Sequence, residues 1–349
     1  MLVQSMATRP AARETVLEVN KSRSMNTAPN TERLSGDAAG LDKARAILGA
    51  GGLLAFPTET VYGLGADARN PDAVARLYAA KERPSFNPLI AHLLDLQAAR
   101  GQGLFDASAQ ALAEAFWPGP LTLVVPTAPS CTISDLARAG LDSVALRVPA
   151  HPLARELLAG LSAPVVAPSA NRSGRVSPTR AEHVLADLDG RIDAVLDGGP
   201  TEVGLESTIV ACISDGPRLL RPGGVPREDI ERVVGPLLGP SHETTPRAPG
   251  MLQSHYAPRA VVRLGAAEIS AGEAARLFGP APPAGSDRAA AALNLSARGD
   301  LVEAAANLFS HLRALDASGA RAIAVAPIPA TGLGEAINDR LRRAAAERG

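Results

Sequence analysis

The stretch Pro57-Thr58-Glu59-Thr60-Val61-Tyr62-Gly63-Leu64-Gly65 decides how the first part of this chain is interpreted. It follows residues 53–56, an apolar run with the length and composition of a buried strand. Three hydroxyl groups and one carboxylate therefore come just after a strand, where open α/β sheets bind their ligands. An ordinary turn, with Gly63 and Gly65 supplying positive φ, explains the same residues equally well.

Helices and strands are predicted to alternate on both sides of this stretch. The predicted helices span residues 42–48, 71–80, 107–116, 152–159 and 226–234. The predicted strands span residues 53–56, 89–93, 121–125, 143–148, 164–167, 193–196, 207–212 and 218–220. Such alternation is typical of an α/β domain.

A second, smaller parallel-sheet domain is predicted near the C-terminus. Strands at 260–264, 290–295 and 320–326 alternate there with helices at 301–315 and 334–346. Before it, residues 235–258 contain five prolines and three glycines, the composition of a linker or an ordered lid loop. We therefore expect a disordered extension (1–36), a first domain (37–235), a linker or lid (236–258) and a second domain (259–349).

Composition indicates a soluble protein with no membrane contact. Its apolar runs are far shorter than the roughly 20 residues that a membrane span needs, and the net charge of -1 gives no overall bias toward nucleic acid. Cys131 and Cys212 are far apart, which supports neither a disulfide framework nor a cysteine-based zinc site and fits a reducing, cytoplasmic environment. We expect no metal held by the protein itself.

A nucleotide would have to be bound without the common phosphate-binding loops. The first strand is not followed by G-x-G-x-x-G, and G-x-x-x-x-G-K-[ST] is absent from the whole sequence. Instead, two cations, Lys81 and Arg83, stand at a helix end. They begin the stretch Lys81-Glu82-Arg83-Pro84-Ser85-Phe86-Asn87-Pro88-Leu89-Ile90-Ala91-His92. They could bind a triphosphate, although a solvated helix C-terminus also favours Lys and Arg.

A third polar loop, Ala167-Pro168-Ser169-Ala170-Asn171-Arg172-Ser173-Gly174 with Ser177, follows another apolar strand. Its small donors can approach a phosphate or ribose closely. Taken alone it is also typical of a surface loop, because serine and asparagine favour turns for local reasons.

Taken together, the motifs PTETVYGLG, KERPSFNPL, APSANRSG, LESTIV and RPG resemble the YrdC domain in order and spacing. RAPGMLQSHYAP (247–258), FSHLRALD and GLGEAINDRLRRAA resemble the long two-domain form of threonylcarbamoyl-AMP synthases. The resemblance covers about residues 40–349. Two features depart from it: Gln253 and Ser254 stand where a more basic or aromatic pair is expected, and the N-terminal extension is unusual.

The resemblance implies an α/β fold: a twisted open sheet around a deep cationic cleft, then a smaller Rossmann-like domain. It implies that L-threonine, bicarbonate or CO2, and ATP with Mg2+ become threonylcarbamoyl-AMP and pyrophosphate, the first step of threonylcarbamoyladenosine (t6A) modification of tRNA. The downstream partner would be the tRNA threonylcarbamoyl transferase machinery, with a possible tRNA contact.

The resemblance also assigns roles by matching motif. Catalytic roles fall to Lys81, Arg83 and Arg147. Threonine would be bound by Thr58, His92, Thr122, Arg147 and Ser207. ATP would be bound by Lys81, Arg83, Ser85, Asn87, Ser169, Asn171, Ser177, Arg221, His255 and Tyr256, with the last two carried on a lid formed by residues 247–258.

This chemistry requires no protein nucleophile, since a threonine carbamate can attack the α-phosphate directly, and the sequence offers no convincing Ser-His-Asp or Cys-His set. Two other functions remain open. An RNA-binding module is disfavoured by 3% aromatic residues and a pI of about 6.6. Carbamoyl transfer in hydrogenase maturation would need cysteine-rich zinc motifs, which two isolated cysteines do not supply.

Overall fold

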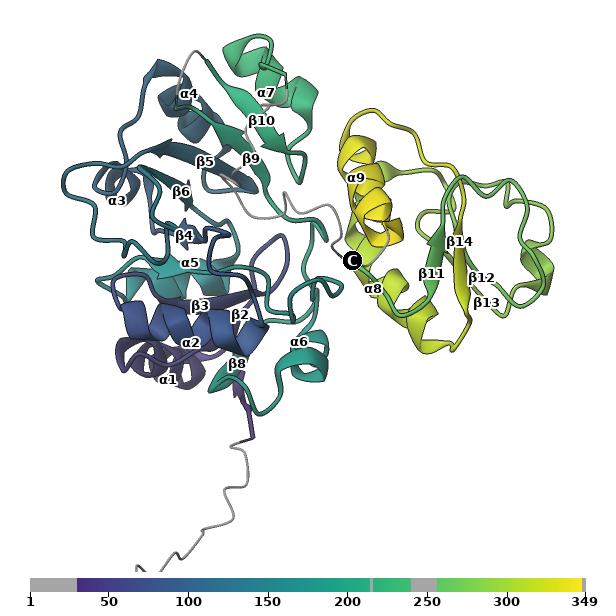
Figure 1. Ribbon diagram of the computed structural model, residues 1–349, viewed down its shortest axis with the longest axis horizontal. Coiled ribbons are helices and arrows are strands. Elements are labelled where there is room, and N and C mark those ends of the chain that lie inside the picture. The colour runs from purple at the N-terminus through teal and green to yellow at the C-terminus, as the bar shows by residue number, and fades with distance from the viewer. Residues whose placement is uncertain (1–29, 214–215, 240–255, 347–349) are drawn as a thin grey trace, which may run out of the picture.

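The computed structural model describes residues 30–213, 216–239 and 256–346, which form two α/β domains (Figure 1). The first is built on a ten-stranded sheet of order β1-β8-β2-β3-β7-β4-β6-β5-β9-β10. Its strands are β1 (Glu32–Ser35), β2 (Leu54–Phe56), β3 (Gly63–Asp67), β4 (Ile90–His92), β5 (Leu121–Pro126), β6 (Ser143–Arg147), β7 (Val165–Val166), β8 (Ala194–Asp197), β9 (Thr208–Ala211) and β10 (Arg218–Arg221).

This sheet is mixed and open. β4 pairs in parallel with β6, and β5 with β9, whereas β7 runs antiparallel to both of its neighbours. Seven helices accompany it among the described residues: α1 (Ala38–Gly49), α2 (Pro71–Lys81), α3 (Leu96–Arg100), α4 (Ala107–Phe116), α5 (Pro152–Ala159), α6 (Ala181–Leu188) and α7 (Arg227–Val234). The α/β fold expected from the sequence is confirmed.

Strand alternation divides the interior of the first domain into separate cores. Successive side chains of a strand point to opposite faces of the sheet. Leu54 and Phe56 of β2 accordingly pack with α1 and α5, whereas the neighbouring Ala55 joins the larger core formed with α2, α4 and α6. Burial on both faces explains why these strands appear in the sequence as continuous apolar runs.

Several elements were not predicted from the sequence. Glu32–Ser35 form β1, so the expectation of disorder over residues 1–36 is wrong for these four residues; residues 1–29 lie outside the described residues. β1 pairs in parallel with β8 at the edge of the sheet, and Leu34 is its only buried side chain. One apolar residue in a short edge strand leaves no alternating pattern to detect.

β3, the short helix α3 and α6 were also missed. The sequence of β3, GLGAD, contains two glycines and no β-branched residue, a composition that disfavours strands. α6 begins without a side-chain cap, because its N-cap residue Arg180 makes no capping hydrogen bond. For β3 and α6, tertiary packing rather than local sequence therefore determines the element.

The second domain contains a four-stranded parallel sheet of order β11-β14-β12-β13. Its strands are β11 (Val261–Arg263), β12 (Ala274–Leu277), β13 (Ala291–Asn294) and β14 (Ala322–Val325), and its helices are α8 (Leu301–Ala317), α9 (Leu333–Ala345) and the short 3-10 turn η1 (Ser286–Arg288). The expected parallel sheet is confirmed, although β12, with sequence AARL, was not predicted.

Helices α8 and α9 lie between the second sheet and the first domain (Figure 1). The approach is close at Gly204 (φ +70°), where a Cβ would lie 2.4 Å from the carbonyl oxygen of Ala305 in α8. Nearby, Arg313 of α8 forms an ion pair of 2.7 Å with Asp187 of α6. Val61, Val176 and Leu205 of the first domain share an apolar core with α8 and α9. The two domains therefore pack directly against each other.

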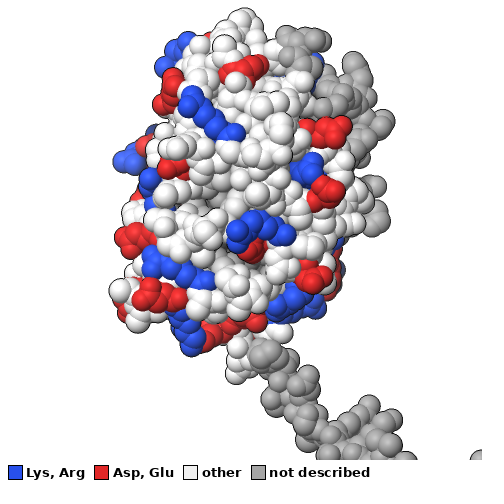
Figure 2. Space-filling view, turned by 90° about the vertical axis from the view of Figure 1, so that its left-hand side faces the viewer, with Lys and Arg blue, Asp and Glu red and all other residues white. Residues whose placement is uncertain are grey.

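The surface shows charges of both signs. On the face of the first domain seen in Figure 2, basic and acidic side chains are interspersed rather than gathered into one area of a single sign. Among the described residues, none of the helices has the length and apolar character required to cross a membrane. Cys131 and Cys212 are both free thiols.

Candidate functional site

Four neighbouring strands place polar side chains on one face of the first sheet. Ile90 and His92 of β4 point to the same face as Ala145 and Arg147 of β6, because residues two apart share a face and His92 is the register partner of Arg147. Ile90 and Ala145 belong to a small apolar core on this face. His92 and Arg147 lie next along β4 and β6 on the same face, just beyond that core.

A hydroxyl pair lies on the neighbouring strands β5 and β9. Thr122 is at the start of β5, and Ser207 immediately precedes β9. Their oxygens Oγ1 and Oγ are 2.8 Å apart, and both side chains are buried. The parallel register of the two strands, with Thr122 opposite Ile209, brings the hydroxyls together.

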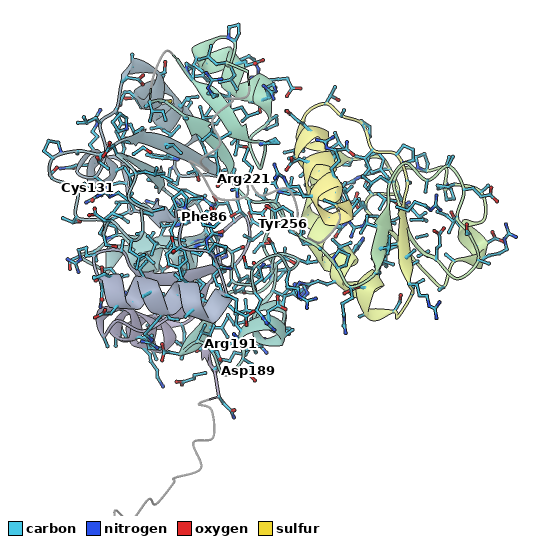
Figure 3. All side chains as sticks on the ribbon, viewed as in Figure 1. Phe86, Cys131, Asp189, Arg191, Arg221 and Tyr256 are labelled. Atoms are coloured by element: carbon cyan, nitrogen blue, oxygen red, sulfur yellow. The ribbon has the colours of Figure 1, made fainter. Side chains whose placement is uncertain are left out.

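A pocket opens beside these strand ends. It collects guanidinium groups from three separate segments of the chain. Arg221 and Tyr256 lie on the side of the first domain that faces the second (Figure 3). The lining residues are Thr60, Val61, Arg83, Ile90, His92, Arg147, Ala167, Pro168, Ser169, Glu206, Ser207, Arg221 and Tyr256.

Arg83 and Arg221 give the pocket its positive charge. Arg83 donates to the carbonyls of Asn87 and Pro88, at 3.2 to 3.4 Å, and forms no ion pair with any described residue. Burial, together with the nearby charge of Arg221, lowers the pKa of Arg83 to about 10. Arg221 donates to the carbonyl oxygen of Ser207 at 2.8 Å and to its hydroxyl at 3.2 Å. Two buried cations that line one pocket and influence each other electrostatically favour an anionic ligand.

Arg147 is the third guanidinium, and it is paired. Its Nη2 lies 2.6 Å from Oε1 of Glu59, whose Oε2 accepts a hydrogen bond from the backbone NH of Ala150. Burial acts to raise the pKa of Glu59, but the charge and hydrogen bond of Arg147 outweigh it, and the pKa is lowered. Glu59 is therefore a carboxylate at neutral pH and fixes the orientation of Arg147.

His92 is a neutral imidazole in this pocket. Burial and the nearby Arg147 lower the pKa of His92 to about 3. Its Nδ1 lies 3.3 Å from the carbonyl oxygen of Ile90, and its ring meets that of Phe56 edge-on. It can supply shape and a hydrogen bond, but not positive charge, at physiological pH.

Lys81, at the end of α2, lies beneath the loop of residues 167–174. Its Nζ donates to the backbone carbonyls of Ser169 and Asn171, the latter at 2.5 Å. Burial lowers the pKa of Lys81 well below its usual range. Since Lys81 is buried and Ser169 lines the pocket, the Lys81 side chain supports the pocket wall from behind.

The structure brings most of the predicted site residues together. Those that line the pocket are Arg83, His92, Arg147, Ser169, Ser207, Arg221 and Tyr256. Those buried outside the lining are Thr58, Lys81, Asn87, Thr122, Asn171 and Ser177. Ser85 is exposed, and His255 lies outside the described residues.

The buried residues outside the lining are connected to it. Thr58 shares a hydrogen bond of 2.7 Å with Thr60, and Ser177 donates to Glu206 at 2.5 Å.

The amide oxygens of Asn87 and Asn171 are buried without a partner among the described residues. Such orphaned acceptors are costly unless a ligand or water donates to them.

Sequence reasoning missed Thr60, Glu206 and Glu59 as parts of this site. Each belongs to a quoted motif, PTETVYGLG or LESTIV, so the motif itself was the available signal. In the described residues, no cluster of three or more His, Cys, Asp or Glu side chains could hold a metal ion. The two acidic side chains nearest the arginines, Glu59 and Glu206, are each paired with an arginine.

Comparison with known proteins covers both domains. Residues 46–223 match the family model described as "Telomere recombination", and residues 225–346 match the model described as "Threonylcarbamoyl-AMP synthase, C-terminal domain". The chain is 42% identical to the threonylcarbamoyl-AMP synthase of Bacillus subtilis (strain 168), over 91% of this chain and 96% of that protein. It is also 42% identical to the threonylcarbamoyl-AMP synthase of Pyrococcus abyssi, over 85% of this chain and 92% of that protein.

Solved structures agree with these matches. The crystal structure of P. abyssi Sua5 complexed with L-threonine superimposes with a TM-score of 0.81 at 36% identity, covering 90% of this chain and 97% of that chain. The agreement extends over both domains. The chain therefore belongs, in its two-domain form, to the threonylcarbamoyl-AMP synthases, the nucleotidyltransferases that carry out the first step of t6A modification of tRNA.

Proposed function

We propose that this chain joins L-threonine, bicarbonate or CO2, and ATP into threonylcarbamoyl-AMP and pyrophosphate. The observation that carries the proposal is the buried pocket on which Arg83, Arg147 and Arg221 converge. Guanidinium groups bind carboxylates and phosphates with directed hydrogen bonds, and this substrate set contains both. The P. abyssi relative solved with L-threonine supports threonine as the amino acid.

Threonine would occupy the part of the pocket beside β5, β6 and β9. The hydroxyl pair of Thr122 and Ser207 offers donors and acceptors to its polar groups, and Arg147 offers a cation to its carboxylate. The full set proposed for threonine is Thr58, His92, Thr122, Arg147 and Ser207. Neutral His92 suits this position because it adds no competing charge.

ATP would lie along Arg83 and Arg221. The loop of residues 167–174, which Lys81 supports, would lie beside the nucleotide. The cations would stabilise charge that develops on the phosphates, acting through preorganised donors in a site from which water is excluded. The full set proposed for ATP is Lys81, Arg83, Ser85, Asn87, Ser169, Asn171, Ser177, Arg221, His255 and Tyr256. Mg2+ would arrive as part of the MgATP substrate.

The reaction needs two bond-forming steps and no protein nucleophile. The threonine amine first adds to CO2, forming an N–C bond and losing a proton, which gives a carbamate. A carbamate oxygen then attacks the α-phosphorus, while the bond from that phosphorus to the pyrophosphate oxygen breaks. Of the proposed catalytic residues Lys81, Arg83 and Arg147, the two arginines would act through position and charge, whereas Lys81 would act through the loop that it holds.

Residues 37–235 would carry out catalysis, residues 236–258 would form a lid and residues 259–349 would form a supporting domain. α7 packs with the first domain, since Ile230 belongs to its larger core. The product would pass to a tRNA threonylcarbamoyl transferase machinery, with a possible tRNA contact. Two free cysteines support a cytoplasmic location.

Incubation of the purified chain with ATP, Mg2+, bicarbonate and labelled threonine tests the proposal. We expect pyrophosphate and a threonine-bearing adenylate, both dependent on bicarbonate. A threonine adenylate formed equally well without bicarbonate would point instead to simple amino-acid activation.

A further inference from the structure

Phe86 is an aromatic side chain that the fold leaves in solvent. The chain has six Phe, three Tyr and one Trp, all within the described residues, and Phe86 is the only one of them that is exposed, at 56%. A single exposed apolar side chain is common at protein surfaces and needs no explanation by itself. The place of Phe86 in the fold, between the predicted ATP ligands Arg83 and Asn87, is what suggests a role.

Phe86 lies at the corner of a β-turn (Figure 3). The backbone NH of Asn87 donates to the carbonyl oxygen of Pro84 at 3.3 Å, and this bond closes the turn. Ser85 and Phe86 are therefore its two central residues. Pro84, Ser85 and Phe86 are exposed, whereas Asn87 is buried. The turn thus carries the ring outward from a buried base.

The base of this turn is held by an arginine of the pocket. Arg83 donates to the carbonyl oxygen of Asn87 at 3.3 and 3.4 Å and to that of Pro88 at 3.2 Å. The hydroxyl of Tyr78 donates to the same Asn87 carbonyl at 3.1 Å. Because the Arg83 side chain also lines the pocket, Phe86 stands beside the cation proposed to bind phosphate. Bracing from two side chains keeps the turn preorganised.

Tyr256, the one Phe, Tyr or Trp among the described lining residues, is committed to packing between the domains. Its ring stacks on Phe309 of α8, with centroids 5.5 Å apart, and the guanidinium carbon of Arg340 of α9 lies 5.4 Å from its centroid. Arg340 also pairs with Glu206 at 2.8 Å; burial acts to raise the pKa of that carboxyl, but the charge of Arg340 lowers it. Tyr256 is only 1% exposed, so the accessible aromatic face beside the phosphate site is that of Phe86.

A nucleotide that is held by its phosphates also needs a surface for its base. The base is joined to the α-phosphate through the ribose, so phosphates bound at Arg83 place it next to the arginines rather than among them. Bases are flat rings with a π-face, and they stack on aromatic side chains with little cost in side-chain entropy when the ring is already held. A braced, exposed phenyl ring suits this contact.

We propose that Phe86 is a specificity-determining residue whose ring stacks on the adenine base of ATP while Arg83 binds the phosphates. This rests on the proposed function in taking ATP as the substrate. It gives the base a contact separate from the phosphate contacts, so the two contributions can be measured apart.

A comparison of two ligands on the full chain tests this. Calorimetry measures the dissociation constants of MgATP and of magnesium tripolyphosphate, which has three phosphates and no base. Phe86→Ala should weaken MgATP binding at least about fivefold and change tripolyphosphate binding less than about twofold, because only the stacking surface is lost. Phe86→Tyr keeps the ring and should bind both ligands within about twofold of wild type.

Leu104→Ala is the matched control. Leu104 is a large apolar side chain of similar exposure, 52%, and it lies outside the lining of the pocket. Its truncation should change the binding of either ligand less than about twofold, as expected for a surface substitution.

Each other result would contradict the proposal in a different way. A folded Phe86→Ala that binds MgATP as tightly as Leu104→Ala overturns it. So does an equal loss for MgATP and tripolyphosphate, because Phe86 would then act on the phosphate site through the turn. A folded Phe86→Tyr that loses as much MgATP affinity as Phe86→Ala excludes stacking. Wild type that binds MgATP but forms no bicarbonate-dependent product would contradict the proposed function, and the two-ligand comparison would still decide the role of Phe86.

Discussion

Arg147 and Glu59 form an ion pair of 2.6 Å in which both side chains are buried, at 5% and 7% exposure. Glu59 follows β2 and Arg147 ends β6, and the two positions are 88 residues apart. Removing one partner of a buried pair leaves the other as an uncompensated buried charge. Loss of either partner should therefore destabilise the domain, and the pair also sets the direction in which Arg147 faces the pocket.

Glu59→Gln should lower the free energy of unfolding by roughly 3 kcal/mol, because Arg147 would remain buried without its carboxylate. Urea unfolding at pH 7 measures this. Glu82→Gln is the control, since Glu82 pairs with Arg172 at the surface, where both side chains are at least 40% exposed. The Glu82 variant should unfold like wild type. Equal losses in the two variants would show that the Glu59 pair has no special stabilising role.

Arg221→Ala should reduce turnover at least about tenfold while leaving the fold intact, because it removes a preorganised cation beside the phosphates. Steady-state kinetics with ATP as the varied substrate measures the effect. Arg218→Ala, on the same strand, removes an arginine that bonds a surface carbonyl at Gly239 and should have little effect. A folded Arg221→Ala with the kinetics of Arg218→Ala would remove Arg221 from the phosphate site.

Ser207→Ala should raise the KM for threonine more than the KM for ATP, since its hydroxyl pairs with Thr122 on the side assigned to the amino acid. A buried polar group left without its partner is penalised. Thr122→Val removes the other half of the pair and should shift threonine use in the same direction. A loss of equal size for both substrates would instead indicate a general distortion of β9.

Acid should destabilise the protein partly through Glu206. Its folded-state pKa of about 2 lies below the ordinary value of 4.5, so its contribution to stability is present above pH 4.5. That contribution is lost as the pH falls from 4.5 toward 2. Glu206→Gln should therefore show a shallower loss of unfolding free energy in urea between pH 5 and pH 3 than wild type. Parallel curves for the two proteins would exclude a depressed pKa at this carboxyl.

Much of the first domain could be predicted because its elements carry local signals. α4 and α5 have the predicted boundaries, with Asp106 capping the first and Pro152 starting the second. β3 and β12 could not be found this way, since glycine and alanine give no strand preference of their own. Their positions are set by the strands on either side.

Site residues could be predicted where they belong to a sequence motif. They could not be predicted where only the packing of distant segments brings them to the pocket. Arg83, Arg147 and Ser207 follow from motif order and lie on the pocket lining. Arg340 lies in a quoted C-terminal stretch, but its sequence neighbours say nothing about Glu206, 134 residues away. A contact between two domains leaves no periodic pattern in either one.

The position of the bound nucleotide decides whether Arg83 and Arg221 have the roles proposed for them. A crystal structure of the full chain with L-threonine and a non-hydrolysable ATP analogue locates it directly. We expect the triphosphate within hydrogen-bond distance of Arg83 and Arg221, and threonine beside Ser207. Between the domains there is also a separate groove, whose lining includes Arg172, Arg259 and Arg313. A triphosphate found in that groove instead would contradict the roles proposed for Arg83 and Arg221.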